Sequence, residues 1–236
     1  MTSANSTTPQ SAIVRNAFDD LCAHLAITDK ATIEAEWQEI VTAHSKPHRS
    51  YHNLRHLEEM LYLLHEFEVP ASELPRLHAF ILYHDFYYET EPLDLFAKNE
   101  ARSAERCTEF LRKSGADGAF IESVANLINA TKTHKLDAAA DLYGALGIDI
   151  DMAILASRAE RYDEYAADVR REFGAYADDV FYPARLKQFL EPTEKSGRIF
   201  LTPHMHEEFN AIALGNIARE KEAIYTRFPL LRPKMA

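Results

Sequence analysis

The chain has 236 residues, of which 47% are hydrophobic and 27% charged, with only 7 glycines and 10 prolines. This length and composition indicate a globular protein that forms one large domain, or a core with an added lobe, rich in helix and poor in tight turns. The net charge of −11 repels nucleic acid polymers and acidic membranes, so we expect neither as a partner. An anionic substrate would need positive charge placed locally.

Cysteine content and hydrophobic patterning exclude further classes of protein. Cys22 and Cys107 are too few and too far apart for a disulfide framework, so we expect a cytoplasmic protein. Residues 1–8 lack the basic start and apolar stretch of a secretory signal, and we expect a disordered leader there. No apolar run approaches the roughly 20 residues that span a bilayer. We predict a single all-α domain over residues 9–228 and a frayed C-terminus over residues 229–236.

The predicted helices begin with two over residues 11–44, where apolar residues recur at helical spacing except at residues 28–30. Pro47 separates them from a third helix, which begins near residues 51–53 and runs to about Phe67. The segment Pro70-Ala71-Ser72-Glu73 opens the next, which leads into His84-Asp85. Further helices are expected over about residues 98–113, 118–131, 157–176, 179–190 and 205–227.

Histidines and acids within this apolar, helical sequence indicate a metal site. His52 and His56 are four residues apart and share one face if Asn53 opens or lies within their helix. The adjacent His84 and Asp85 are separated by about 100° around a helix axis, which suits neighbouring positions on one ion. Imidazole and carboxylate ligands suit Mn²⁺, Fe²⁺, Co²⁺, Ni²⁺, Zn²⁺ and sometimes Mg²⁺, and the absence of nearby cysteine excludes a thiolate zinc structure.

A complete site needs at least one more carboxylate from a remote segment. Asp149 and Asp151 are the best candidates because both acids interrupt an apolar stretch, where an unpaired charge is rarely buried. The alternative for Asp151 is a helix cap or a solvated acid. His44, His48, His204 and His206 are interpreted as surface residues, since Pro47 and Pro203 disturb any helical register around them.

The order of these residues resembles the HD superfamily of metal-dependent phosphohydrolases, whose pattern is a histidine, a His-Asp pair and a distant aspartate. Here the order reads His56, His84-Asp85 and Asp151. The resemblance implies an HD-domain helical bundle with additional N- and C-terminal helices. Between Asp85 and Asp151 the chain lacks the additional histidine and aspartate pairs of the two-metal phosphodiesterases, apart from His134, so we expect one tightly bound divalent ion. It also favours Asp151 over Asp149, because the superfamily's aspartate precedes an apolar stretch such as Met152-Ala153-Ile154-Leu155.

Two further motifs sharpen the resemblance. His52-Asn53-Leu54-Arg55-His56 is similar to the His-Asn-x-x-His signature of cyclic nucleotide phosphodiesterases, which implies that His52 donates a proton and His56 binds metal. A closer likeness is to a bacterial family of uncharacterised predicted HD phosphohydrolases, over most of residues 10–226. Its elements read here as His84-Asp85-Phe86-Tyr87-Tyr88, Asn99-Glu100-Ala101-Arg102-Ser103-Ala104 and Thr131-Lys132-Thr133-His134.

These residues predict metal-assisted hydrolysis of a small phosphoester, and the resemblance favours a nucleotide. Glu100 is expected to orient or deprotonate the attacking water, with a favourable acid in a first helical turn as the alternative. Lys132 and His134 are expected to contact phosphate, or else simply to end a helix. Arg170 and Arg185 are more remote candidates for anion binding, against surface pairing with nearby acids. His52 could instead bond to backbone.

Two other functions remain open from the sequence. A di-iron oxygenase would use a related scaffold and would require His52 or His134 to bind a second iron. A ligand-binding or regulatory module would keep the metal without turnover. The oligomeric state is not predicted.

Overall fold

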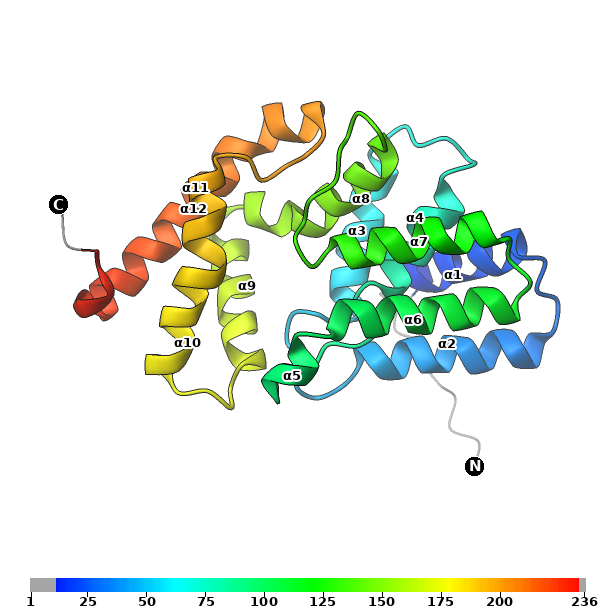
Figure 1. Ribbon diagram of the computed structural model, residues 1–236, viewed down its shortest axis with the longest axis horizontal. Helices are drawn as coiled ribbons and strands as arrows, with labels where there is room; N and C mark the ends of the chain where they lie inside the picture. Colours follow the sequence, from blue (N-terminus) through cyan, green and yellow to red (C-terminus); the bar gives the residue numbers. More distant parts are fainter. Residues whose placement is uncertain (1–11, 234–236) are drawn as a thin grey trace. The chain divides into compact units, whose positions relative to one another are not determined.

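The computed structural model describes residues 12–233, and every regular element within that range is helical (Figure 1). The all-α prediction is therefore confirmed. The expected leader, residues 1–8, lies outside the described residues, as do residues 234–236 of the expected frayed end. Part of that end, Pro229–Leu231, forms a short 3₁₀ helix (η4). None of the helices in residues 12–233 combines the length and the apolar character that crossing a membrane requires.

The chain divides into two compact units at the peptide bond between Ile150 and Asp151. The prediction of one domain over residues 9–228 stays a prediction. The first unit contains α1 (Ala12–His24), α2 (Lys30–His44), α3 (Leu54–His65), α4 (Leu74–Tyr83), α5 (Leu93–Phe96), α6 (Asn99–Lys113), α7 (Gly118–Ala130) and α8 (Leu142–Asp151), which ends one residue past the division.

Helix α4 is the centre of the first unit. Every residue from Leu77 to Tyr83 is buried, because the run Leu-His-Ala-Phe-Ile-Leu-Tyr is apolar nearly all round the helix. This helix contacts α1, α3, α6 and α7, and α6 and α7 pack along each other. A helix enclosed on all sides gives a rigid support for the residues that follow its last turn.

Caps explain where several predicted helices begin. Asp29 accepts hydrogen bonds from the backbone N–H groups of Ala31 and Thr32, which starts α2 and accounts for the interruption at residues 28–30. Asp117 starts α7 in the same way.

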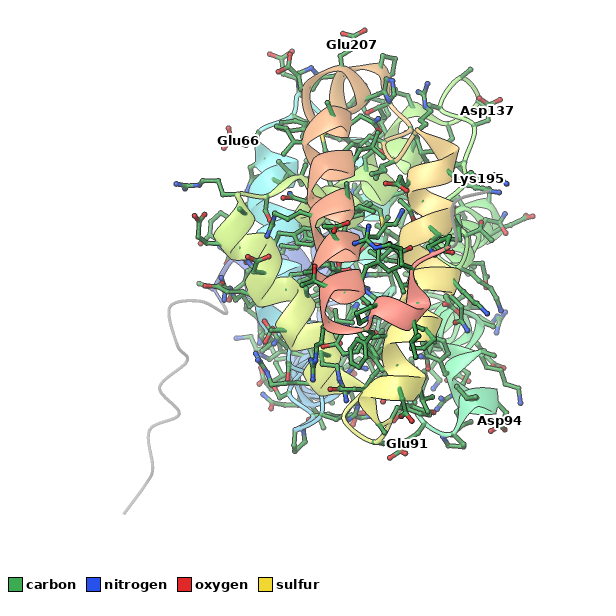
Figure 2. All side chains as sticks on the ribbon, turned by 90° about the vertical axis from the view of Figure 1, so that its left-hand side faces the viewer. Glu66, Glu91, Asp94, Asp137, Lys195 and Glu207 are labelled. Carbon is green, nitrogen blue, oxygen red and sulfur yellow. The ribbon has the colours of Figure 1, made fainter. Side chains whose placement is uncertain are left out.

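At the surface, charged side chains project outward, as Figure 2 shows for Glu66, Glu91, Asp94, Asp137, Lys195 and Glu207.

The second unit is built on the long helix α12 (Pro203–Arg227), which contacts the 3₁₀ helix η2 (Met152–Ala156), the π-helical turn η3 (Leu186–Leu190), α11 (Glu191–Ser196) and η4. Helices α9 (Ala159–Glu172) and α10 (Asp178–Arg185) complete it. A partly buried ion pair joins α10 to α12, with Nε of Arg185 3.0 Å from Oε1 of Glu220. The hydroxyl of Tyr162 donates to the other carboxylate oxygen of Glu220 at 2.6 Å.

Candidate metal centre

His56 lies in the first turn of α3, and Asn53 determines where that helix begins. The side-chain oxygen of Asn53 accepts from the N–H of Arg55 at 2.9 Å, while its amide nitrogen donates to the carbonyl of Ser50 at 2.8 Å. These bonds satisfy an N–H group of the first turn and fix the chain before it. His56 then points into the interior, where only 3% of its surface is exposed.

His84 follows the last residue of α4 and is buried, as expected for a residue at the end of that helix. Its Nδ1 lies 3.0 Å from the carbonyl oxygen of Ile81. A carbonyl only accepts, so Nδ1 carries the proton and the Nε2 of the neutral ring keeps a lone pair. A backbone partner of this kind orients a histidine that binds metal through Nε2.

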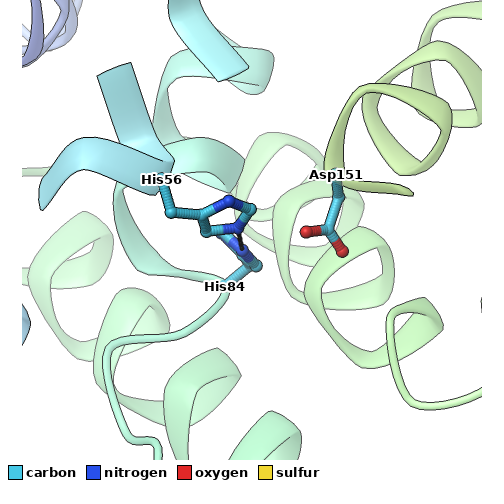
Figure 3. Close-up of side chains that lie close together, drawn as sticks. All are labelled: His56, His84 and Asp151. Carbon is cyan, nitrogen blue, oxygen red and sulfur yellow. Dashed lines mark hydrogen bonds between the residues drawn. The ribbon is translucent and has the colours of Figure 1, made fainter. Parts of the chain in front are cut away.

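The two imidazoles meet a carboxylate in one group (Figure 3). Nε2 of His56 lies 3.3 Å from Nε2 of His84. One ligand atom from each of His56, His84 and Asp151 lies within 4.8 Å of the others. Oδ2 of Asp85 lies 3.2 Å from Nε2 of His84. Two imidazoles and two carboxylates therefore approach through the atoms that bind metals, and three of these residues form a group that could hold an ion.

The donor set fits a divalent ion. Metal–nitrogen bonds of about 2.0–2.1 Å place neighbouring ligands of one ion roughly 2.8–3.4 Å apart, for octahedral to tetrahedral angles. The 3.3 Å between the two Nε2 atoms matches this spacing. Neutral imidazoles with anionic carboxylates also balance a divalent charge in a buried place, where an unpaired carboxylate would be costly.

Asp151 is the last residue of α8, so the helix of the first unit positions it. Asp149 lies two residues earlier and is fully buried, at 0% exposure. A shift of two residues turns a side chain by about 200° around a helix. The two acids therefore leave α8 in different directions, and the one grouped with the histidines is Asp151.

Helix α8 contacts α4 through a glycine. A Cβ added at Gly147 would lie 3.1 Å from Cδ2 of Leu77 and 3.3 Å from the ring of Phe80. Such a distance is tighter than ordinary van der Waals contact, so the absence of a side chain at Gly147 allows this close approach. The approach places the ends of α4 and α8, with His84 and Asp151, on the same side of the unit.

Arg49 joins the segment before α3 to the segment after α4, and sequence reasoning missed it. Its guanidinium donates to the carbonyl oxygens of His52 at 3.3 Å, Asp85 at 2.7 Å and Phe86 at 2.9 Å. Only 5% of Arg49 is exposed. An arginine among histidines gives no sign in a sequence that its partners will be backbone carbonyls, so no pattern could have found this residue.

His52 precedes α3, since the helix starts at Leu54 after the cap residue Asn53. A shared helical face therefore does not bring it to His56. Its ring centroid nevertheless lies 5.8 Å from that of His56, and 3.8 Å from that of Tyr88, on which it stacks at 22°. The expected proximity holds for a different reason: the ring of Tyr88 and the main chain near Arg49 orient His52.

Glu100 lies in the first turn of α6, between two residues that bind the segment after Asp85. Asn99 and Ser103 hydrogen-bond to the backbone of Glu89 and Tyr87 respectively. Oε2 of Glu100 is buried and has no hydrogen-bond partner. An unpaired carboxylate oxygen in such a place is costly unless a water or a ligand satisfies it, so Glu100 keeps the expected capacity to bind a water.

The expected phosphate contacts lie in two regions. Nζ of Lys132 donates to the carbonyl of Ala97 at 2.9 Å, and His134 adopts a left-handed backbone with φ of 49° after α7. In the second unit, Arg170 bonds to Asp178 and to the carbonyls of Phe173 and Tyr176, while Arg185 pairs with Glu220. Lys132, Arg170 and Arg185 each already use at least one hydrogen-bond donor on these partners. Substrate contact by these three residues and by His134 stays a prediction.

One surface assignment is wrong. His44, expected at the surface because of Pro47, is 1% exposed, and its Nδ1 bonds to the carbonyl of Ile40 at 3.0 Å. Burial and the nearby cation of Arg49 lower the pKa of His44 to about 3. The last turn of α2 continues to His44, so Pro47 lies beyond the helix and does not affect this register.

Comparison of the chain with protein-family models, with curated proteins and with solved structures found no match, so the geometry of the candidate site is the basis for a proposal.

Proposed function

We propose that this chain is a metal-dependent hydrolase of a small phosphoester. The observation that supports it most is the group of His56, His84 and Asp151, whose ligand atoms lie within 4.8 Å of one another in a largely buried place. The order of these residues and of Asp85 resembles the HD superfamily, and the preference for a nucleotide substrate rests on that resemblance alone.

His56, His84, Asp85 and Asp151 would hold the ion. A bound divalent ion supplies two effects in such a site: it acidifies a water and neutralises charge on a phosphoryl oxygen. Water attacks phosphorus, and the bond from phosphorus to the leaving oxygen breaks. Oε2 of Glu100 accepts the proton of the attacking water, and the imidazole of His52 donates a proton to the leaving oxygen. The products are an alcohol and a phosphate.

Local positive charge is needed because the chain carries a net charge of −11. Lys132 and His134, in the turn after α7, are the candidates for holding the phosphate. The Nζ of Lys132 is exposed and bonds to one backbone carbonyl, so an anion can replace that partner. Arg170 and Arg185 are further candidates, whose present carboxylate partners would have to be exchanged.

The test combines elemental analysis with a phosphoester screen. Purified protein is loaded separately with Mn²⁺, Co²⁺, Ni²⁺, Zn²⁺ and Mg²⁺ and assayed against nucleotides and small mono- and diesters. We expect one ion per chain and hydrolysis that disappears in His84→Ala and Asp85→Ala. His65→Ala is the matched control, because His65 is an exposed histidine on the same helix as His56.

Three results would contradict the proposal. If His84→Ala and Asp85→Ala bind metal and turn over substrate like the parent, the site is assigned to the wrong residues. Two irons per chain would instead support a di-iron oxygenase. Metal binding without hydrolysis of any phosphoester would support a ligand-binding or regulatory module.

A further inference from the structure

The segment from Tyr87 to Glu89 is fixed at three consecutive residues. Oγ of Ser103 accepts from the N–H of Tyr87 at 3.0 Å, and the amide of Asn99 pairs with both backbone groups of Glu89, at 3.0 and 2.9 Å. Asn99 and Ser103 lie one turn apart on α6 and are 3% and 0% exposed. Buried hydrogen bonds to a main chain hold it in one conformation.

Tyr88 lies between these two anchored residues and is fixed by a third bond. Nε2 of His48 donates to the carbonyl oxygen of Tyr88 at 2.9 Å. Next to it, Nζ of Lys46 lies 2.7 Å from Oε1 of Glu89, which joins the same two segments. The backbone of Tyr88 is therefore bound by His48, and α6 binds the backbones of its two neighbours, Tyr87 and Glu89.

The ring of Tyr88 in turn stacks on His52. The centroids are 3.8 Å apart and the planes differ by 22°. Tyr51 meets the His52 ring edge-on at 4.8 Å, and His56 does so at 5.8 Å. Since His52 precedes α3, no helical backbone sets its direction, and these rings supply the constraint.

We propose that Tyr88 is a positioning residue that holds the imidazole of His52 in the orientation from which it protonates the leaving oxygen. This inference rests on the proposed function. Proton transfer from a positioned side chain contributes about 10²–10⁴-fold to a rate, and a misdirected donor loses much of that. Removal of the Tyr88 ring should therefore impair the proton-dependent part of the reaction and spare metal binding.

Tyr87 provides a matched control. Its ring lies under the guanidinium of Arg102, at 4.1 Å, and meets Phe86 edge-on at 5.4 Å. Its backbone bonds to Ser103 do not involve the ring. Tyr87→Leu therefore removes a neighbouring aromatic ring and leaves the stack of Tyr88 on His52 in place. A second control, Tyr88→Phe, keeps the stacked ring and removes only its hydroxyl.

The first experiment observes His52 directly by proton NMR of the purified protein with Zn²⁺, which is diamagnetic. The His52 ring signal is assigned by its loss in His52→Gln. We expect Tyr88→Leu to move this signal toward the position of a free histidine, because the ring current of Tyr88 is gone, while Tyr88→Phe and Tyr87→Leu leave it in place. An unchanged His52 signal in Tyr88→Leu would overturn the inference.

The second experiment compares leaving groups. A 4-nitrophenyl phosphate ester releases a phenolate, which leaves without being protonated. A nucleoside 5′-monophosphate releases an alkoxide, which needs a proton to leave. We expect Tyr88→Leu to lower kcat about 10²-fold for the nucleotide and only slightly for the nitrophenyl ester, with metal content unchanged. Tyr88→Phe should restore the nucleotide rate, and Tyr87→Leu should change neither.

Equal losses on both substrates would show a general structural effect and overturn the positioning role. If the parent protein hydrolyses neither substrate with any of the ions, the proposed function fails and the role in proton transfer fails with it. The NMR comparison then still decides whether the Tyr88 ring stacks on His52, so the two failures are distinguishable.

Discussion

Arg76 and Asp141 form a bidentate ion pair, with Nη1 to Oδ2 at 2.8 Å and Nη2 to Oδ1 at 2.7 Å. Arg76 lies in the first turn of α4, and Asp141 caps α8 by accepting from the N–H of Gly144 at 2.8 Å. The pair thus joins the beginnings of the two helices that end beside His84 and at Asp151. With Gly147 packed on α4 between them, the two helices run in the same direction and bring His84 and Asp151 into one group.

Loss of this ion pair should lower stability at neutral pH. Hydrogen bonds from Arg76 lower the pKa of Asp141; partial burial opposes them, and the N–H of Gly144 adds to them. We expect Asp141→Asn to reduce the free energy of unfolding by about 1–2 kcal/mol at pH 7, since the pair is only partly exposed and also caps a helix. Urea unfolding measures this, with Asp94→Asn as the exposed control.

The same substitution has a defined pH dependence. A carboxyl group whose pKa is lower in the folded protein stabilises it above the unfolded pKa of about 3.9, and this contribution is lost as pH falls through the folded pKa. The difference in stability between parent and Asp141→Asn should therefore be constant from pH 7 to about 5 and shrink below about pH 4. A difference that stays constant down to pH 3 would mean that the charge of Asp141 contributes nothing.

Asp151 and Asp149 should respond differently when each is changed to asparagine. We expect Asp151→Asn to weaken metal binding by more than the about 10- to 100-fold that loss of an outer-shell partner costs. Asp149→Asn should retain one ion per chain, because Asp149 is not in the group with the two histidines. Titration calorimetry and elemental analysis measure both, and the reverse result would identify Asp149 as the ligand.

Replacement of Arg49 tests the connection between the two ligand-bearing segments. Arg49→Met leaves the carbonyls of His52, Asp85 and Phe86 without this donor, so we expect a loss of about 3 kcal/mol in the free energy of unfolding. Arg49→Lys keeps the charge but not the planar fork, and should lose part of this amount. A stability equal to that of the parent in both variants would show that solvent replaces the guanidinium.

A side chain at Gly147 should separate α4 from α8. We expect Gly147→Leu to cost about 1–3 kcal/mol through overpacking against Leu77 and Phe80, and to weaken metal binding because the helix ends move apart. Gly215→Leu is the control: Gly215 also lies within a helix, and a Cβ there meets open space. That variant should gain up to about 1 kcal/mol from helix propensity. Thermal unfolding with and without metal separates the two effects.

Helices with one polar face or a clear cap could be predicted from the sequence. Asp29 and Asn53 lie at the starts expected for the second and third helices, and His84 lies at the expected helix end. A helix carrying Asp151 was expected, but no bounds were predicted for α8. Its residues from Gly144 to Ile150 are all buried, so no alternation of polar and apolar residues marks the helical period.

The residues of the candidate site that could bind metal were predictable from the sequence. The residues that hold them in place were not. Histidine and aspartate carry their chemistry in their identity, so His56, His84 and Asp151 could be named from spacing and resemblance. Arg49 acts on backbone carbonyls, and Tyr88 acts by stacking, contacts that only the folded chain defines. The position of His52 outside α3 likewise depends on Asn53, which caps the helix. The prediction of a shared face for His52 and His56 required His52 to lie within that helix.

The choice of carbonyl oxygens as partners for Arg49 has a consequence for redesign. Every amino acid offers the same carbonyl, so the hydrogen bonds of Arg49 beside the candidate site do not depend on which side chain stands at His52 or Asp85. Ligands could therefore be exchanged, for example Asp85 for glutamate or histidine, while the scaffold that presents them keeps its shape. Under the proposed function, metal preference would then be adjustable one residue at a time.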